Sequence, residues 1–148
     1  MAVKPIPDQY HSAQPYLLVD DASRLMEFMK ATFGAEDLGT MPTPEGKIGH
    51  AEMRIGDTIV MLADASTAEG VSGAMPSTVV TYVEDCDATY KRALDAGAKS
   101  IREPQDMFYG DRSAGVADPV GNHWWIHTHV EDVTEDEMMR RAQQQQRS

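Results

Sequence analysis

The chain has 148 residues, 41% of them hydrophobic, and a formal net charge of −11 at pH 7. This length suits one well-packed domain, and the acidic excess with no basic cluster argues against a nucleic-acid partner. The apolar runs are short and the first ten residues lack the apolar core of a secretion signal, so we expect a cytoplasmic protein with no membrane partner. The single cysteine, Cys86, excludes an intrachain disulfide framework and fits a reducing compartment.

One pattern of strand and helix is present twice along the chain. In the first copy an extended apolar run ends in an acidic pair at residues 20–21, and the helix predicted after it ends at Gly34. In the second copy the acidic pair lies at residues 84–85 and the helix ends at Gly97. Acidic side chains cap helix N-termini, and glycine tolerates the left-handed conformation that ends a helix, so local chemistry predicts both boundaries.

Three strands are predicted after each helix, where apolar and β-branched residues lie in short runs bounded by turn residues. Their bounds are 36–41, 47–55 and 57–63 in the first copy, and 99–103, 107–117 and 123–130 in the second. The last two strands meet at Asp118-Pro119-Val120-Gly121, where proline presets the turn and glycine ends it. The order of strand, helix and three strands, used twice, predicts an α+β protein of two βαβββ modules.

The two modules are expected to form a single domain that is followed by a helical tail. The bounds are 1–133 for the domain, with module one at 14–64, a linker at 65–76 and module two at 77–133, and 134–148 for the tail. The linker is rich in glycine and small residues. In the tail, Thr134 and Glu137 have capping-box spacing, but the glutamine run has no apolar face, so we expect a short frayed helix.

Alternate residues of a strand lie on the same face of its sheet, and this sorts the polar residues of two strands. The strand at 47–55 has an apolar face that should meet a helix and a polar face with His50 and Glu52. The last strand places Trp124 on one face and four other side chains on the opposite face: His123, Trp125, His127 and His129. One face of this strand is therefore unusually rich in imidazole.

His50 and Glu52 allow two interpretations. Together with His123 or His127 they could form an acid–base pair or a metal site, since a carboxylate beside an imidazole fixes its tautomer and raises its pKa. The same residues could form a polar network across the strands that only stabilises the sheet. The sequence leaves both interpretations open.

The aromatic residues and one arginine also allow a functional and a structural interpretation. Trp125 could stack on a ligand or fill the cavity. Arg112, with Asp111 beside it, could grip an anionic or carbonyl substrate, or form an ion pair that fixes the hairpin. Tyr16 and Tyr82, from the first strands of the two modules, are expected to line the pocket.

Three motifs accompany the repeated module. Val19-Asp20-Asp21 and Gly34-Ala35 frame the first helix, the third strand reads GHAEMRIGD, and the last hairpin reads GDRSAGVADPVGNHW. With the βαβββ order, these motifs resemble the vicinal oxygen chelate superfamily of glyoxalases, bleomycin-resistance proteins and dioxygenases, and most of all its PhnB-like branch. The resemblance covers residues 14–133. It implies two modules whose strands form an eight-stranded pair of half-barrels around a cavity, with helices outside, and chains that pair as homodimers.

The resemblance also implies where a metal would bind. Metal-dependent members place their ligands at four positions, which correspond here to Gln14, Met61, Thr78 and Trp125. Gln14 could offer a carbonyl oxygen, but threonine is a poor neutral ligand and the other two side chains bring neither a hard oxygen nor an imidazole. We therefore expect no bound metal and no other cofactor.

Two classes of function remain open. The first is a metal-independent protein that binds a small organic molecule in the cavity, in the manner of a drug-sequestering protein. Its expected ligand-binding residues are Trp125, Tyr16, Tyr82, Gln14, Met61, Thr78, Arg112, His123 and His127. The alternative is a glyoxalase-like lyase or isomerase acting on a carbonyl compound, with Glu52, beside His50, or a pocket histidine as the base.

Overall fold

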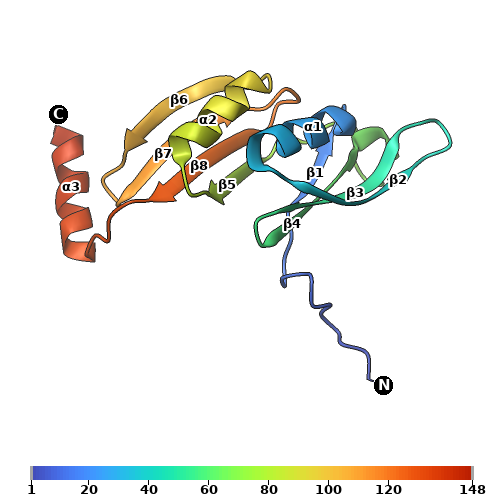
Figure 1. Ribbon diagram of the computed structural model, residues 1–148, viewed down its shortest axis with the longest axis horizontal. Coiled ribbons are helices and arrows are strands. Elements are labelled where there is room, and N and C mark those ends of the chain that lie inside the picture. Colours follow the sequence, from blue (N-terminus) through green and yellow to red (C-terminus); the bar gives the residue numbers. More distant parts are fainter. Residues whose placement is uncertain (1, 148) are drawn as a thin grey trace.

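The computed structural model describes residues 2–147 and contains two four-stranded sheets (Figure 1). The first module consists of β1 (Tyr16–Val19), α1 (Ala22–Phe33), β2 (Glu36–Pro42), β3 (Ile48–Ile55) and β4 (Thr58–Asp64). Its strands lie in the order β1-β4-β3-β2, and only the β1–β4 pair is parallel. The predicted strand, helix and three strands are all present.

The second module repeats this arrangement. It consists of β5 (Thr78–Tyr82), α2 (Cys86–Asp95), β6 (Lys99–Asp106), β7 (Asp111–Ala117) and β8 (His123–His129), in the order β5-β8-β7-β6. The linker contains one turn of 3-10 helix, η1 (Ala65–Thr67), and the tail forms α3 (Glu135–Arg147). Among residues 2–147, no helix is long and apolar enough to span a bilayer.

Both module helices begin where the sequence predicts and α1 ends where predicted, whereas α2 ends at Asp95 with Ala96, not Gly97, as its C-cap. The carboxylate of Asp21 accepts a hydrogen bond from the backbone of Arg24 at 3.2 Å, and Asp85 accepts one from Ala88 at 3.1 Å. Each acidic side chain thus satisfies one of the free N–H groups in the first turn of its helix. After α1, Gly34 adopts a left-handed φ of 66°, which the absence of a Cβ makes inexpensive.

The core lies between the helices and the sheets, and Trp124 is at its centre. The Trp124 indole is fully buried and lies 6.0 Å from the ring of Phe28 and 5.1 Å from that of Phe33, measured between centroids. Both phenylalanines come from α1, so this tryptophan of module two joins the modules. Its Nε1 donates to Asp118 at 2.7 Å, which ties the Asp-Pro turn to the core.

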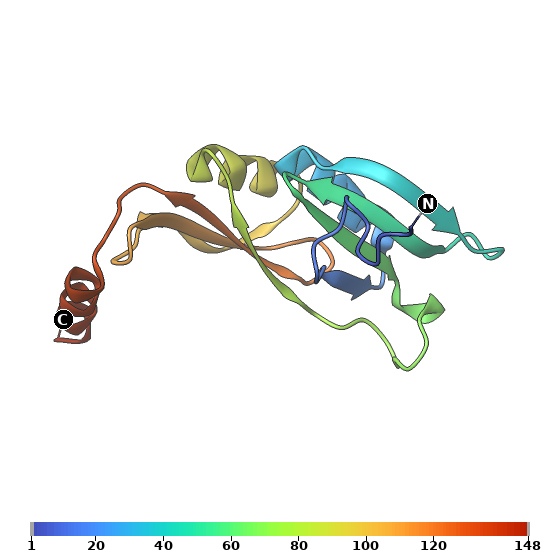
Figure 2. The same cartoon turned by 90° about the horizontal axis from the view of Figure 1, so that it is seen from below.

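The two helices lie on the same side of the two sheets, with α1 beside α2 (Figure 2). Within residues 2–147 no helix covers the opposite face of either sheet, and we call this face the open face. Trp124 lies on the helix side and Trp125 on the open face, which confirms the alternation predicted for this strand. Ala51 and Met53 of β3 are fully buried on the helix side, as predicted, whereas His50 and Glu52 lie on the open face.

The hairpin before β7 differs from the prediction. Met107–Gly110 forms a turn rather than a strand, closed by a hydrogen bond from the backbone N–H of Met107 to the carbonyl of Asp111 at 2.7 Å. Gly110 has a φ of 98°, and a Cβ there would meet the carbonyl oxygen of Glu131. The turn therefore requires glycine, because it brings two backbone segments into contact.

The tail helix is longer than predicted. α3 has 13 residues, and Thr134 accepts a hydrogen bond from the backbone of Glu137 at 3.2 Å, as the capping spacing predicts. The expectation of a short helix was wrong, because contacts of a charged side chain, rather than an apolar face, attach α3 to the rest of the chain. Arg141 donates to Glu131 at 2.7 Å and to the Phe108 carbonyl at 3.3 Å, and α3 projects away from the sheets on these contacts (Figure 1).

Candidate functional site

The open face of module one carries a hydrogen-bonded cluster around Glu52. His50 lies 2.9 Å from Glu52 through Nε2 and 2.9 Å from the hydroxyl of Tyr16 through Nδ1. Tyr10, from the segment before β1, donates to the other carboxylate oxygen of Glu52 at 2.6 Å. Because a carboxylate only accepts, Nε2 of His50 donates to Glu52. The predicted pairing of His50 with Glu52 is present.

The electrostatics of this cluster weaken Glu52 as a base. The hydrogen bond from Tyr10, and then that from His50, lowers the pKa of the Glu52 carboxyl. The contact between Tyr10 and Glu52 also raises the pKa of Tyr10, because deprotonation would place two negative charges side by side.

A cavity of about 410 Å³ lies beside the cluster and is also lined by Met41 and Ile59. The residues that line this cavity are both polar and apolar.

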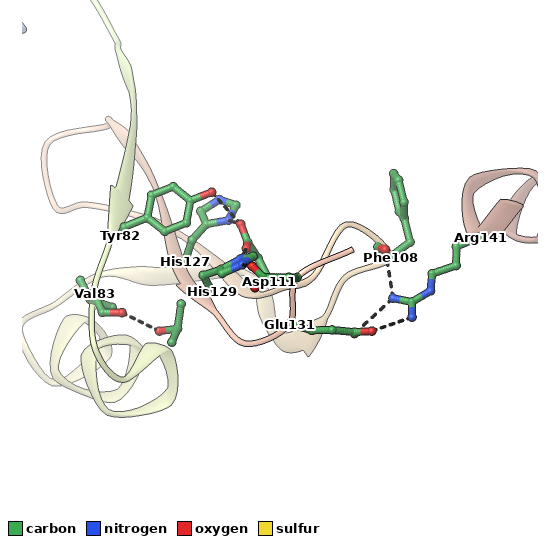
Figure 3. A network of polar contacts seen from close by, with 10 residues as sticks. Tyr82, Val83, Phe108, Asp111, His127, His129, Glu131 and Arg141 are labelled. Carbon is green, nitrogen blue, oxygen red and sulfur yellow. Dashed lines mark hydrogen bonds and ion pairs between the residues drawn. The ribbon is translucent and has the colours of Figure 1, made fainter. Parts of the chain in front are cut away.

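A second cluster lies on the open face of module two, centred on Asp111 (Figure 3). Asp111 is buried and accepts from the hydroxyl of Tyr82 at 2.7 Å, from His129 at 2.8 Å and from His127 at 3.3 Å. The other ring nitrogen of His129 lies 2.8 Å from Asp132. Both nitrogens of His129 thus face carboxylates and donate, which describes an imidazolium ion.

The pKa shifts in this cluster follow from these contacts. Burial pushes the pKa of Asp111 upward, but the hydrogen bonds from His129, Tyr82 and His127 together outweigh it, so that the pKa is lowered. The contact with Asp111 raises the pKa of Tyr82. Asp132, and then Asp111, raises the pKa of His129. In this cluster Asp111 is therefore negatively charged and His129 positively charged. Nε2 of His127 has no hydrogen-bond partner among the described residues.

Trp125 is positioned by a row of residues across three strands. Arg102 of β6 pairs with Gly115 of β7, and Gly115 pairs with Trp125 of β8. A Cβ on Gly115 would lie 2.7 Å from Cε3 and 2.8 Å from Cη2 of the indole, so the ring lies across the glycine. The Arg102 guanidinium lies over this ring, 4.9 Å from its centroid. Arg102 and Trp125 thus form a cation–π pair on the open face.

The four positions at which metal-dependent relatives place ligands do not fit a metal here. Gln14 uses its side-chain oxygen to accept from the backbone of His11 at 2.6 Å. Thr78 begins β5 with an exposed side chain, and Met61 and Trp125 bring no hard donor. Within residues 2–147, no cluster of three or more His, Cys, Asp or Glu side chains has the geometry of a metal site.

The structure separates several residues that the sequence grouped together. His50 lies in module one and contacts Tyr16 and Glu52, whereas His127 lies in module two and contacts Asp111. His123 is exposed at the start of β8. The combined cluster of His50 with His123 or His127 is not present in the described residues.

Arg112 lies on the helix side of β7, away from the open face. It donates to both carboxylate oxygens of Asp87 in α2, at 2.7 and 3.0 Å, and to Asp106 at 3.2 Å. These contacts correspond to the structural interpretation, an ion pair that fixes the hairpin. Its neighbour Asp111 lies on the opposite face, because adjacent residues of a strand alternate.

Two residues of the open face were not predicted as site residues. Tyr10 lies before the first predicted strand, in a segment with no motif, and reaches Glu52 only through the folded chain. Arg102 lies where β6 has irregular register on both sides, between Ser100 and Gln105. Such irregularities interrupt strict alternation, so the face of Arg102 could not be assigned from the sequence.

Two βαβββ modules with helices on one side and polar, aromatic open faces on the other define the class of this protein. The chain belongs to the Glyoxalase/Bleomycin resistance protein/Dioxygenase superfamily, whose family model matches residues 10–126. The predicted superfamily is thereby confirmed.

Known relatives and solved structures agree with this assignment. The chain is 39% identical over 132 residues to the uncharacterized protein Mb0911c of Mycobacterium bovis, covering 84% of this chain and 87% of the relative. It is 38% identical over 110 residues to the anthracycline biosynthesis protein DnrV of Streptomyces peucetius, covering 71% of this chain but 36% of DnrV. Among solved structures, TioX from Micromonospora sp. ML1 superposes with a TM-score of 0.67 and 28% identity, covering 80% of this chain and all of TioX.

Proposed function

We propose that this protein binds a small planar organic molecule on the open face of module two without a metal ion, and sequesters it as a dimer. The observation that carries the proposal is the placement of Trp125. Its indole is turned away from the core and lies between Gly115 and the Arg102 guanidinium on the open face, where a planar ligand could take the place of the guanidinium. Aromatic rings are well suited to stack on an indole.

Two further observations support this proposal. The four positions that hold the metal in metal-dependent relatives carry side chains that bind metals poorly, so the usual polarisation of substrate oxygens by a cation has no donor set here. The relative DnrV is named for anthracycline biosynthesis, which supports a small organic molecule as the class of ligand. We also propose that the chain belongs to the PhnB-like branch of the superfamily, which the GDRSAGVADPVGNHW motif resembles.

The dimer is proposed because the open faces expose large apolar side chains. Tyr16, Val80 and Tyr82 are 44%, 59% and 66% exposed. Val80 and Tyr82 lie on the edge strand of their sheet, and Val80 is the direct neighbour of Trp125 in β8. A second copy that covers these residues would turn the open face into an enclosed cavity. Sedimentation equilibrium tests this part, and a monomer at micromolar concentration would refute it.

A second candidate function rests on His127. Asp111 orients this imidazole through Nδ1, and no described residue occupies Nε2, as expected for a general base. A carbonyl compound stacked on Trp125, two residues away on the same face, would lie near that nitrogen. In this candidate, His127 removes a proton beside the carbonyl group. Glu52 is less suited to the same role, because its pKa is lowered.

One pair of measurements separates the two functions. A glyoxalase assay is run with added divalent metal and again with chelator, and binding of aromatic ligands is measured by calorimetry for the wild type, Trp125→Ala and His50→Ala. We expect no activity in either assay, and loss of binding in Trp125→Ala but not in His50→Ala. Robust activity that disappears with chelator would overturn the metal-free proposal. Activity that survives chelator and is lost in His127→Gln would favour the enzyme.

A further inference from the structure

The side chain of Arg102 is incompletely satisfied. One terminal nitrogen of its guanidinium donates to the hydroxyl of Ser113 at 2.6 Å, but Nε is buried and has no hydrogen-bond partner in the described part of the chain. A buried donor without an acceptor is unfavourable, because it has lost its bond to water and gained nothing in return. Native proteins contain few such groups, and a water, an ion or another group from outside the chain completes some of them.

The charge of Arg102 is also unpaired, although the chain is strongly acidic. Between residues 2 and 147 no carboxylate forms an ion pair with Arg102, whereas Arg112, Arg140 and Arg141 each pair with Asp or Glu. The net charge of −11 makes acidic partners abundant. Its nearest aromatic neighbour, Trp125, contributes only the weaker attraction of a cation over a ring.

We propose that Arg102 and Trp125 together form a subsite for a planar aromatic anion, such as an aromatic carboxylate. The inference rests on the proposed function, since it names the chemical class of the ligand that stacks on Trp125. In the free protein the guanidinium covers the indole. When the ligand binds, its ring takes that place on the indole, and the guanidinium turns toward the carboxylate. The two carboxylate oxygens then accept from Nε and a terminal nitrogen, the fork geometry that arginine offers to planar anions.

The surroundings restrict the geometry of this subsite. Gly115 lets the indole lie flat, and Ser113 holds one end of the guanidinium at the sheet surface. The anionic group is therefore expected to lie toward β6 and the ring toward β8. The acidic residues of the second cluster lie further along β8, where Asp111 pairs with His129, so they do not neutralise Arg102.

Two matched probes test this proposal: 2-naphthoate, which carries a carboxylate, and 2-naphthamide, which has the same ring and no charge. Binding to the full chain is measured at pH 8 by calorimetry and by the indole N–H signals in NMR spectra. We expect naphthoate to bind at least about fivefold more tightly than naphthamide, because one charge-assisted hydrogen bond accounts for a difference in affinity of about this size. Trp125→Ala should weaken both probes, since both rings stack on the indole.

The variants Arg102→Gln, Arg102→Lys and Lys91→Gln assign the preference to the guanidinium. Arg102→Gln should remove the preference and leave naphthamide affinity within about twofold, whereas Arg102→Lys should keep part of it, since lysine retains charge but not the fork. Lys91→Gln removes one positive charge from the exposed surface of α2, and this variant should keep the preference for naphthoate. Circular dichroism confirms that each variant is folded.

Three outcomes would overturn the inference. Equal affinity for the two probes in the wild type would refute the anion subsite. It would not contradict the proposed binding function. A preference that persists in Arg102→Gln would show that another group recognises the anion. Failure of both probes to bind the dimer would refute the subsite and the stacking function together, and would point to a carboxylate of the second copy as the partner of Arg102.

Discussion

Gly115→Ala is predicted to clash with one side chain, that of Trp125. The new Cβ would lie 2.7 and 2.8 Å from two carbons of the indole, whereas unstrained carbon contacts are about 3.5–4.0 Å. The ring must therefore move by roughly 1 Å or swing into solvent. Overpacking of this kind costs about 1–3 kcal/mol, and the half-buried position of Trp125 places the cost at the lower end.

A glycine-to-alanine change also alters the unfolded chain, and this contribution must be separated. Where the native backbone is compatible, the change stabilises by about 0.4–1 kcal/mol, because alanine has less conformational freedom when unfolded. Gly73 is the matched control, since a Cβ there would meet no atom within 4 Å and its φ is not in the left-handed region. Gly73→Ala should therefore raise the free energy of unfolding by this amount, because it adds no clash.

A double-mutant cycle isolates the clash between Gly115→Ala and Trp125. Urea unfolding is followed by circular dichroism for the wild type, Gly115→Ala, Trp125→Ala and the double variant. We expect a coupling of about 1–2 kcal/mol, because removal of the indole abolishes the overlap. A coupling below about 0.5 kcal/mol, the limit of ordinary additivity, would refute the geometry of the Arg102, Gly115 and Trp125 row. The indole N–H signal of Trp125 should also shift in Gly115→Ala, and that of Trp124 should not.

Three other predictions follow from the described contacts. Arg112→Gln should lower the free energy of unfolding only slightly in urea titrations, because the pair with Asp87 is partly exposed, and should leave naphthoate affinity unchanged. A loss of affinity in calorimetry would show that Arg112 reaches the ligand. The pKa of His129 is raised in the folded state, chiefly by Asp132, so its contribution to stability is fully present below the unfolded pKa of about 6.5 and is lost as the pH rises through the raised value. The stability difference between the wild type and His129→Gln should accordingly shrink from pH 5.5 to pH 9 in urea titrations, and an unchanged difference would contradict the assignment. Burial raises the pKa of Cys86 to about 11, so a disulfide reagent at pH 8 should label the native thiol far more slowly than the urea-unfolded one; rapid labelling of the native protein would show that the thiol is exposed.

The predicted fold was correct in its elements because their signals are local. Both acidic caps and Gly34 are confirmed, and so is the opposite placement of Trp124 and Trp125. Capping and alternation depend only on residues a few positions apart in the chain. The two errors have different causes. Met107–Gly110 is rich in aromatic and bulky residues but forms a turn, and α3 is held by contacts of Arg141 with distant residues rather than by an apolar face.

The candidate site was predicted only in part. The pairing of His50 with Glu52 followed from alternation, since the two residues lie two apart on one strand. The contact of Asp111 with Tyr82 joins residues from β7 and β5, which are separated in the sheet by β8. No spacing along the chain encodes such a contact, because it depends on the register of three strands at once.

Through its resemblance to a known superfamily, the sequence implied a set of metal-ligand positions whose side chains suit a metal poorly. By itself the sequence determined the two modules, the starts of their helices and the open faces of the strands. These properties follow from the period of each element and from side-chain chemistry. Only the tertiary structure decided which open-face residues meet: Tyr10 with Glu52, Asp111 with two histidines, and Arg102 with Trp125. The physical reason is that strand register, the irregularities of β6 and the close approach allowed at Gly115 are set by packing between segments far apart in the chain.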